Sequence, residues 1–373
     1  MRKIVIAPDK FKGSLTACQA ADAIERGILR ADPRAHCVHC PMADGGEGTV
    51  DVFLARGASR HTARVAGPLG DPVEAVYAIC DKTAILEMAG ASGLELLPRS
   101  EHDPTRTDTF GTGQLIRAAL DAGATHLIIG VGGSATNDAG TGMLRALGVR
   151  FLDRDGVAID GPILAFERLE SIDLGGLDAR LKRVRIEAAV DVDDPLSGPS
   201  GASYMFAAQK GANPDQIRRL DAVLGHIADV AAAALGRDHR NDAGAGAAGG
   251  LGFALAAFLG ATLEPGVALI ARESGLEQLL TDATCCMTGE GKIDDQKLHG
   301  KAVAGVAEIA SKHRVPVIAF CGVAEPEAVA ALAKRNVRVI PIAPKTMSRE
   351  ESMRSAAALL ESAAMAAVRS ANG

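Results

Sequence analysis

The feature that most constrains this chain of 373 residues is the alternation of short apolar runs with amphipathic segments at both of its ends. Near the amino terminus, "KIVIAP" has the pattern of a buried strand, and Ala20, Ile24 and Ile28 follow it at helical spacing. A second strand around "HCVHCPMA" and a second helix through "GTVDVFLAR" come next. This order is typical of a parallel sheet covered by helices.

The middle of the chain has a different pattern. Three successive strands with Gly/Pro turns between residues 59 and 88 indicate an antiparallel meander, after which helices and strands alternate to the end. We therefore predict an α/β fold in which residues 1–62 and 282–373 form one discontinuous domain, with a second α/β domain, residues 63–281, inserted in it. Open α/β sheets bind ligands at the carboxyl ends of their strands, so the active site is expected in the inter-domain cleft.

Composition excludes several classes of function. A net charge of -6 and an aromatic content of 3% argue against nucleic-acid binding, which needs a basic face or stacking side chains. No apolar run approaches the roughly 20 residues that span a bilayer, and the amino terminus lacks the features of a signal peptide. Seven cysteines, an odd number, fit reduced thiols. We expect a cytoplasmic protein.

Five polar, glycine-bearing loops each follow a predicted strand: "APDKFKGS", "ADGGEGT", "GVGGSATND", "DVDDPLSG" and "TGEGKID". The polar side chains of "SATND" are expected to be exposed. Glycine lets the backbone approach a phosphate closely, and N–H groups at a following helix start bind anions. Two acidic groups lie in or directly after the last two segments, Asp191, Asp193 and Asp194 in one and Glu290, Asp294 and Asp295 in the other. Together the segments indicate a polyanionic ligand and its metal ion.

Other interpretations of these segments stay open. Thr16 and Gln19 form a capping box, and Asp44 and Glu47 have the same spacing, so the second pair fits a helix cap as well as a ligand site. The segment "GAGAAGGLG" fits close helix packing equally well, and His299 has no feature that sets it apart. Gly130, Gly132 and Ala135, with Asp153 further on, match the fingerprint of a dinucleotide-binding loop, which would indicate an NAD(P)-dependent oxidoreductase.

The segments taken in order resemble a known family. "IAPDKFKGSLTA", "PMADGGEGT", "ILEMAGASGL", "GTGQLI", "GVGGSATNDAGTGML", "DPLSGPSGA", "QKGA", "GAGAAGGLG" and "TGEGKID" are similar, in order and spacing, to the bacterial glycerate kinases. The resemblance implies a Rossmann-like or flavodoxin-like domain with an inserted α/β domain. It also implies a kinase that uses ATP and Mg²⁺ to phosphorylate D-glycerate, giving 2-phosphoglycerate as the usual product of the family.

The resemblance suggests roles for individual residues. Lys12, Lys210, Lys292 and Lys301 are candidate cations, Asp191 is the candidate base, and Asp191 and Asp294 are the candidate metal ligands. The residues expected to bind substrate or phosphate are Asp9, Lys10, Gly13, Ser14, Asp44, Gly45, Gly46, Gly132, Gly133, Ser134, Thr136, Asn137, Asp138, Gly289, Glu290, Gly291 and Lys292.

The sequence departs from the usual family pattern at a few positions. Lys10 stands in place of Ser, Asp194 in place of Asn, Ala207 and Ala208 in place of Gly-Pro, and Ala243 in place of Pro. The added Lys and Asp lie near the candidate site. They leave open which acid the protein prefers as substrate and how tightly it binds the metal ion. A nucleotide-binding regulator without catalytic activity is the non-enzyme alternative, and a homodimer is left open.

Overall fold

In the computed structural model, residues 2–294, 302–344 and 346–370 are described. The chain divides into two compact units. The first consists of residues 1–44 and 265–373, and the second of residues 45–264. Each unit has its own sheet, so both are α/β units.

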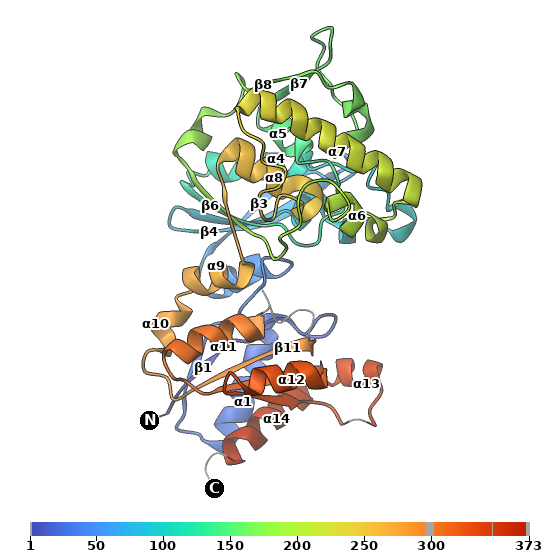
Figure 1. Cartoon of the computed structure of the whole chain (residues 1–373). Helices are drawn as coiled ribbons and strands as arrows, with labels where there is room; N and C mark the ends of the chain where they lie inside the picture. Colours follow the sequence, from blue (N-terminus) through green and yellow to red (C-terminus); the bar gives the residue numbers. More distant parts are fainter. Residues whose placement is uncertain (1, 295–301, 345, 371–373) are drawn as a thin grey trace. The chain divides into compact units, whose positions relative to one another are not determined.

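The first unit contains a five-stranded sheet in the order β13-β12-β11-β1-β2, in which every neighbouring pair is parallel. Helices α1 and α14 lie side by side, with α11 on the other side of the sheet, as Figure 1 shows. Both α1 and α14 pack on the face formed by Ile4, Ile6, Met287 and Phe320. The strands are β1 (Lys3–Ile6), β2 (His36–His39), β11 (Cys285–Ile293), β12 (Val317–Ala324) and β13 (Val337–Pro341). The helices are α1 (Ala17–Ala31), α9 (Gly266–Glu273), α10 (Leu276–Leu280), α11 (Ala302–Lys312), α12 (Pro326–Ala333), α13 (Arg349–Arg354) and α14 (Ala356–Ser370).

The second unit contains a six-stranded sheet in the order β10-β9-β6-β5-β4-β3. The four strands from β10 to β5 are parallel, and β4 and β3 continue the sheet as the antiparallel meander that the sequence predicts. The strands are β3 (Ser59–Ala66), β4 (Pro72–Cys80), β5 (Thr83–Glu87), β6 (His126–Gly130), β9 (Arg185–Ala189) and β10 (Thr262–Glu264), and β7 (Arg150–Leu152) pairs separately with β8 (Ser171–Asp173).

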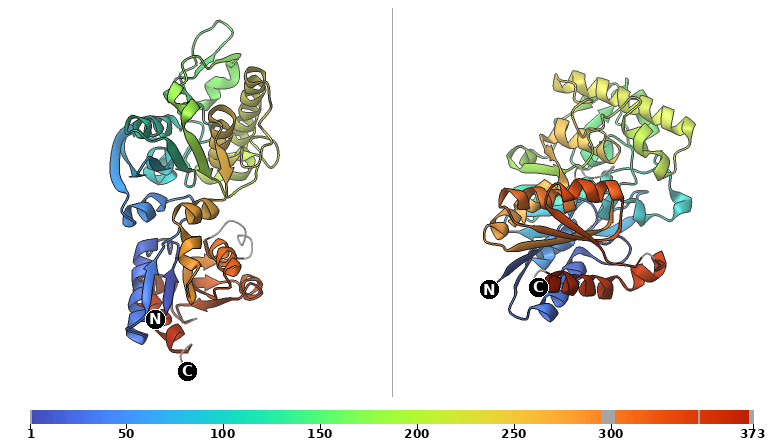
Figure 2. Two further views of the ribbon diagram at one scale, coloured as in Figure 1. Left: turned by 90° about the vertical axis from the view of Figure 1, so that its left-hand side faces the viewer. Right: turned by 60° about the horizontal axis from the view of Figure 1, so that its bottom comes forward.

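Helices of the second unit gather mainly on one face of its sheet, visible in Figure 1 and, from other sides, in Figure 2. These helices are α4 (Phe110–Asp121), α5 (Thr141–Ala146), α6 (Ala202–Phe206), α7 (Pro214–Leu235) and α8 (Ala247–Leu259), and α2 (Thr49–Ala55) packs on β4 and β5. Shorter helical segments are α3 (Ala89–Ser92), η1 (Leu94–Leu96), η2 (Arg99–Glu101), η3 (Ile163–Arg168), η4 (Ala179–Arg183) and η5 (Ala208–Lys210). Buried side chains from these elements form one large core.

The junctions between the units fall at residues 44/45 and 264/265, whereas the sequence analysis placed them at 62/63 and 281/282. Long-range packing accounts for the difference. Helix α2 packs on β4 and β5, and the N–H of Val50 donates to Glu87 Oε1 at 2.7 Å, which attaches this helix to the second unit. Helices α9 and α10 pack on α11 and belong to the first unit.

The local signals at helix starts are partly confirmed. Thr16 caps α1 and forms the expected capping box with Gln19. Helix α2, in contrast, begins after Gly48, whose φ is 93° and which makes no side-chain cap, so the capping interpretation of Asp44 and Glu47 is wrong. No helix within the described ranges is both long enough and apolar enough to cross a membrane.

Candidate active site

The loop that follows β1 is held against β11 in the first unit. The backbone N–H of Asp9 donates to the Gly289 carbonyl at 2.9 Å, and the Thr288 hydroxyl donates to the Ala7 carbonyl at 2.7 Å. Asp9 is buried, and its carboxylate accepts a hydrogen bond of 2.6 Å from the N–H of Lys10. An acidic and a basic residue are thus fixed next to each other at the carboxyl end of β1.

The rest of this loop is a tight turn. The backbones of Phe11 and Leu15 bond each other at 2.9 and 3.0 Å, and the Ser14 hydroxyl donates to the Phe11 carbonyl at 2.9 Å. Gly13 has a φ of 76°, a conformation that costs glycine little and other residues more. Lys12 is exposed at this turn. The conformation of the turn explains why glycine stands at position 13. The one described hydrogen bond of the Ser14 hydroxyl also lies within this turn.

Two ion-pair groups lie among the predicted residues of the first unit. Lys10 Nζ lies 3.6 Å from Asp44 Oδ1, so the lysine that departs from the family pattern is held beside a predicted site carboxylate. Lys292 Nζ lies 2.9 Å from Glu325 Oε1 and 3.3 Å from Asp294 Oδ2, and these two carboxylates raise the pKa of Lys292. Both groups bring carboxylates and ammonium groups together.

The segment "TGEGKID" is part of a strand, so the prediction of a polar loop there is wrong. Strand β11 continues to Ile293, with Glu290 opposite Cys321 and Lys292 opposite Val323 on β12. A Cβ added at Gly289 would lie 2.5 Å from the Phe320 carbonyl oxygen, which explains the glycine by close strand contact. Pairing with β12 decides the conformation here, because strand preference depends on tertiary context. Glu290 and Asp294 are both buried.

In the second unit, the glycines of two predicted segments pack against each other. A Cβ at Gly130 would lie 2.3 Å from the Gly45 carbonyl oxygen, and one at Gly132 would lie 2.7 Å from the Cα of Gly46. The loop following β6 therefore needs glycines in order to contact the 45–46 backbone. This packing explains the match to a dinucleotide fingerprint without a dinucleotide, and helix α5 starts only at Thr141.

The polar residues after Gly133 are buried. Thr136, Asn137 and Asp138 are fully buried and Ser134 is 9% exposed, which corrects the expectation of an exposed polar loop. The Nζ of Lys210, at the end of η5, donates to Ser134 Oγ and to the Thr136 carbonyl, both at 2.7 Å. Burial lowers the pKa of Lys210 to about 7, and the nearby Asp138 opposes this shift. The structure thus brings a buried cation to the predicted anion loop.

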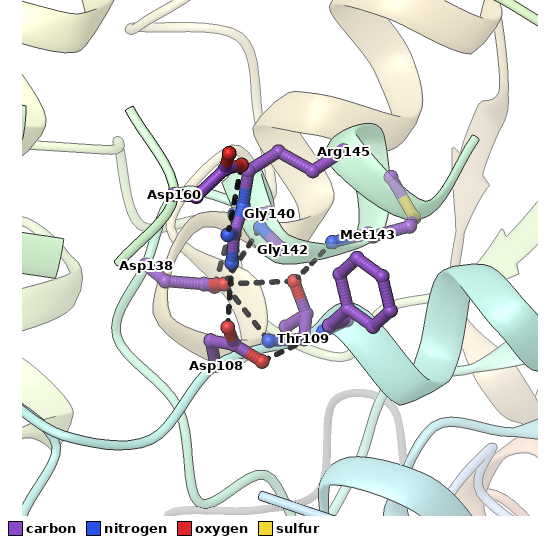
Figure 3. A network of polar contacts seen from close by, with 9 residues as sticks. Asp108, Thr109, Asp138, Gly140, Gly142, Met143, Arg145 and Asp160 are labelled. Carbon is purple, nitrogen blue, oxygen red and sulfur yellow. Dashed lines mark hydrogen bonds and ion pairs between the residues drawn. The ribbon is translucent and has the colours of Figure 1, made fainter. Parts of the chain in front are cut away.

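Asp138 lies in a polar network that joins α4 to α5 (Figure 3). Its carboxylate accepts hydrogen bonds from the N–H and hydroxyl of Thr109 at 2.9 and 2.8 Å, and from the N–H groups of Gly140 and Gly142 at 3.1 and 3.2 Å. Burial raises the pKa of Asp138, and the nearby Asp108 carboxylate adds to this. These four hydrogen bonds within the protein support a structural role for Asp138.

Asn137 has a partner that the sequence analysis did not identify. Its amide Nδ2 donates to the hydroxyl of Ser203, on α6, at 2.9 Å, and Ser203 is fully buried. Within the part of the chain that the structure describes, Asn137 Oδ1 and Thr136 Oγ1 are buried and have no hydrogen-bond partner. Such atoms are rare in native proteins, because a buried polar group without a partner destabilises the fold.

A turn with left-handed backbone lies against this pair. Ala248, Gly249 and Gly250 have φ values of 52°, 68° and 92°, and a Cβ at Gly249 would lie 2.5 Å from the Cα of Asn137. The Gly249 carbonyl also accepts a hydrogen bond of 2.9 Å from the N–H of Ala139. The segment "GAGAAGGLG" thus packs closely, as one interpretation expects, but it does so against residues 136–139 through a non-helical turn and not through a helix.

The acidic loop begins directly after β9. Asp191 follows Val190 at the carboxyl end of the strand, and its side chain is exposed, as is that of Asp193. Asp194 is half-buried, and its carbonyl accepts a hydrogen bond of 2.8 Å from the N–H of Gly246. Asp191 thus lies where parallel sheets present reactive groups.

The other candidate residues include three outside the described ranges and two glycines. Asp295, His299 and Lys301 lie outside the described residues. Gly291 lies in β11, and a Cβ there would lie 3.2 Å from the backbone nitrogen of Lys12. Gly133 has a φ of 77°, in the left-handed region that favours glycine. Ser203 could not have been found from sequence, because it is 66 positions from Asn137 and lies in a short helix without a motif.

Comparison with known proteins identifies the family. The chain has two α/β units with polar, glycine-rich segments after their strands. It matches the model of the "Glycerate kinase family" over residues 4–372. The chain is therefore a member of the glycerate kinase family.

Individual relatives agree with this assignment. The chain is 50% identical to a glycerate kinase of Bacillus subtilis (86% of this chain and 85% of the relative) and 45% identical to one of Halalkalibacterium halodurans (98% and 97%). It is 50% identical to the glycerate 2-kinase of Escherichia coli K12, with 86% and 85% covered. The crystal structure of a putative glycerate kinase 2 from Salmonella typhimurium LT2 superposes with a TM-score of 0.88 at 43% identity, covering 100% of this chain and 98% of that one.

Proposed function

We propose that this protein is a glycerate kinase that transfers the γ-phosphoryl group of ATP to D-glycerate and forms 2-phosphoglycerate. The observation that carries the proposal is the family match over residues 4–372, with relatives named glycerate kinase at 45–50% identity. In the reaction, a hydroxyl oxygen of glycerate forms a bond to the γ-phosphorus while the bond from that phosphorus to the β–γ bridging oxygen breaks. ADP leaves, and the hydroxyl proton passes to a base.

The base is proposed to be Asp191. Its exposed carboxylate stands at the carboxyl end of β9, where a substrate can reach it. A carboxylate in hydrogen-bond reach of the acceptor hydroxyl takes its proton as the oxygen attacks, an effect typically worth about 10²–10⁴ in rate. Lys12, Lys210 and Lys292 are proposed to offset negative charge, which is the main requirement of phosphoryl transfer.

ATP and Mg²⁺ are proposed as cosubstrate and cofactor. Mg²⁺ usually takes one or two carboxylates, with phosphate oxygens and water completing its coordination. Asp191, and Asp294 with its buried carboxyl group, have the required donor chemistry, and Asp9 and Glu290 are further buried carboxylates. When bound, the ion would neutralise phosphate charge.

Backbone and side-chain groups are proposed to bind the substrate or the phosphate groups of the ligands. The candidates in the first unit are Asp9, Lys10, Gly13, Ser14, Asp44, Gly289, Glu290, Gly291 and Lys292, and those in the second are Gly45, Gly46, Gly132, Gly133, Ser134, Thr136, Asn137 and Asp138. The buried ammonium of Lys210 supports the assignment for Ser134, because a buried cation attracts an anion strongly where little water screens it.

Two further proposals concern the cellular location and the oligomeric state of the protein. We propose that it acts in the cytoplasm, where ATP is available and thiols stay reduced; none of the seven cysteines, all of them in the described part of the chain, forms a disulfide. A homodimer is also proposed, and size-exclusion chromatography with light scattering measures it.

The decisive experiment is a coupled assay of ADP release. With ATP, Mg²⁺ and D-glycerate, the protein is expected to release one ADP for each phosphoglycerate formed, and ³¹P NMR distinguishes the 2- from the 3-phosphate. No reduction of NAD(P) is expected with glycerate alone. Reduction of NAD(P) without ADP release would contradict the proposal in favour of an oxidoreductase, and nucleotide binding without turnover would favour a regulator.

A further inference from the structure

In the buried pair Thr136 and Asn137, the oxygen of the Asn137 amide has the wrong hydrogen-bonding character for an anion. Asn137 Nδ2 already donates to Ser203 Oγ, so the atom left without a partner in the described structure is the acceptor Oδ1. Carboxylate and phosphate oxygens are acceptors only and cannot bond a second acceptor. The atom requires a donor instead.

A hydroxyl group has the hydrogen-bonding character that each of the two residues requires. It donates its proton to Asn137 Oδ1 and accepts one from the hydroxyl of Thr136, whose Oγ1 likewise has no partner among the described residues. If the oxygen and nitrogen of the Asn137 amide exchange places, a ligand hydroxyl still fits, because a hydroxyl both donates and accepts hydrogen bonds. The chemistry of the pair therefore matches an alcohol.

The surroundings hold both residues in place. Ser203 fixes the amide of Asn137, Lys210 bonds the Thr136 carbonyl, and Gly249 packs closely against the backbone of both residues. Both side chains are fully buried. A ligand group that bonds these side chains loses its hydrogen bonds to water. A ligand that cannot replace those bonds with bonds to the protein therefore binds much more weakly.

We propose that Thr136 and Asn137 bind the hydroxyl of the acceptor that is not phosphorylated, and that this contact selects glycerate over acids with a single hydroxyl. The inference rests on the proposed glycerate kinase function. Ser203 is a positioning residue that keeps the acceptor atom of Asn137 available. Sites built to bond a substrate hydroxyl reject the analogue that lacks it by large factors, whereas apolar pockets do not.

The test compares kcat/KM for D-glycerate with that for D-lactate and 3-hydroxypropionate, which each lack one of the two hydroxyls. The unaltered protein is expected to prefer D-glycerate by about 100-fold or more over the analogue that keeps the reacting hydroxyl. Thr136→Val and Asn137→Ala are each expected to reduce this ratio about tenfold or more, through loss of activity on D-glycerate. Ser203→Ala is expected to reduce it less.

Stability measurements separate this role from a structural one. Thr136→Val replaces a buried hydroxyl without a partner by a methyl group, so its Tm is expected to be unchanged or higher. Thr136→Ser keeps the hydroxyl and is expected to keep the preference. Thr107→Val is the matched control: Thr107 is buried, and its hydroxyl donates to the Ala135 carbonyl at 2.8 Å. This variant is expected to lower Tm and leave the preference unchanged.

The outcomes distinguish the inference from the function on which it rests. ADP release with D-glycerate, together with an unchanged ratio in Thr136→Val and Asn137→Ala, would overturn the inference alone. A lower Tm of Thr136→Val with an unchanged ratio would do the same, since the hydroxyl would then serve the fold. Absence of ADP release with D-glycerate in the unaltered protein would overturn both.

Discussion

Lys210 and Ser134 are joined by a hydrogen bond of 2.7 Å although 76 positions separate them in the chain. The same ammonium bonds the Thr136 carbonyl, and both contacts are buried. A cation in this position holds the segment after β6 and places positive charge next to it. Its protonation state therefore affects both stability and ligand binding.

The first prediction concerns pH and Lys210. Burial lowers the pKa of this group to about 7 in the folded protein, whereas the reference value for an unperturbed lysine is 10.5. Between these values the unfolded chain binds more protons than the folded one, so the contribution of Lys210 to the free energy of unfolding rises with pH. Compared with Lys210→Met, the unaltered protein is expected to gain up to about 1.4 kcal/mol per pH unit between pH 7 and 10.

Urea unfolding of both proteins at several pH values measures this difference, because other titrating groups are shared and cancel. Curves that stay parallel from pH 7 to 10 would show that Lys210 keeps an ordinary pKa. A loss of stability of the unaltered protein relative to Lys210→Met with rising pH would have the opposite sign and contradict the prediction as well.

The second prediction concerns Asp138. Its carboxylate accepts four hydrogen bonds from the starts of α4 and α5, all of them buried. Asp138→Ala leaves these donors without a partner, and each buried donor without a partner costs about 1–3 kcal/mol. The free energy of unfolding is expected to fall by at least about 3 kcal/mol in urea titrations.

Asp160→Ala provides the control, because Asp160 is largely exposed and its Oδ1 lies 3.8 Å from Arg145 Nη1 in the same network. It is expected to change stability by less than about 0.5 kcal/mol. Asp138→Ala with near-parental stability and reduced ligand affinity would instead assign Asp138 to ligand binding.

The third prediction concerns Gly130. A methyl group there would lie 2.3 Å from the Gly45 carbonyl oxygen, so the two loops must separate. Gly130→Ala is expected to destabilise the protein by about 1–3 kcal/mol, the usual cost of overpacking. Gly161→Ala is the control, because its Cβ would meet Ala165 at an ordinary 3.5 Å. An unchanged Tm for Gly130→Ala would mean that the glycine serves a ligand and not the contact with Gly45.

The fourth prediction concerns Asp191. Asp191→Asn keeps the shape of the side chain and removes the base, so kcat is expected to fall by about 10²–10⁴ with little change in the affinity for ATP or D-glycerate. Asp193→Asn, at an exposed position two residues further on, is the matched control and is expected to keep most of the activity.

Titration with Mg²⁺ separates two roles of Asp191. If the carboxylate holds the metal, raising the Mg²⁺ concentration is expected to restore part of the rate of Asp191→Asn, whereas a lost base is not restored. Turnover close to that of the unaltered protein would remove Asp191 from the mechanism and favour Asp294.

The sequence by itself determined the properties that depend on near neighbours. Strand and helix alternation, the capping box of Thr16 and Gln19, and the meander between residues 59 and 80 follow from periodicity and turn residues, and the structure contains all three. The ordered motifs also led to the family, because nine short segments in a fixed order carry more information than any one of them.

Tertiary structure decided the properties that depend on distant contacts. Pairing with β12 makes "TGEGKID" a strand, contact with residues 45–46 explains Gly130 and Gly132, and packing buries the "SATND" side chains. Ser203 comes from 66 positions away, where no local pattern marks it. Lys210 stands in the motif "QKGA" and is a predicted cation, but its contact with Ser134, 76 positions away, depends on the fold. Side-chain burial and long-range hydrogen bonds depend on the path of the whole chain, and for that reason the chemical character of Asn137 emerged only from the fold.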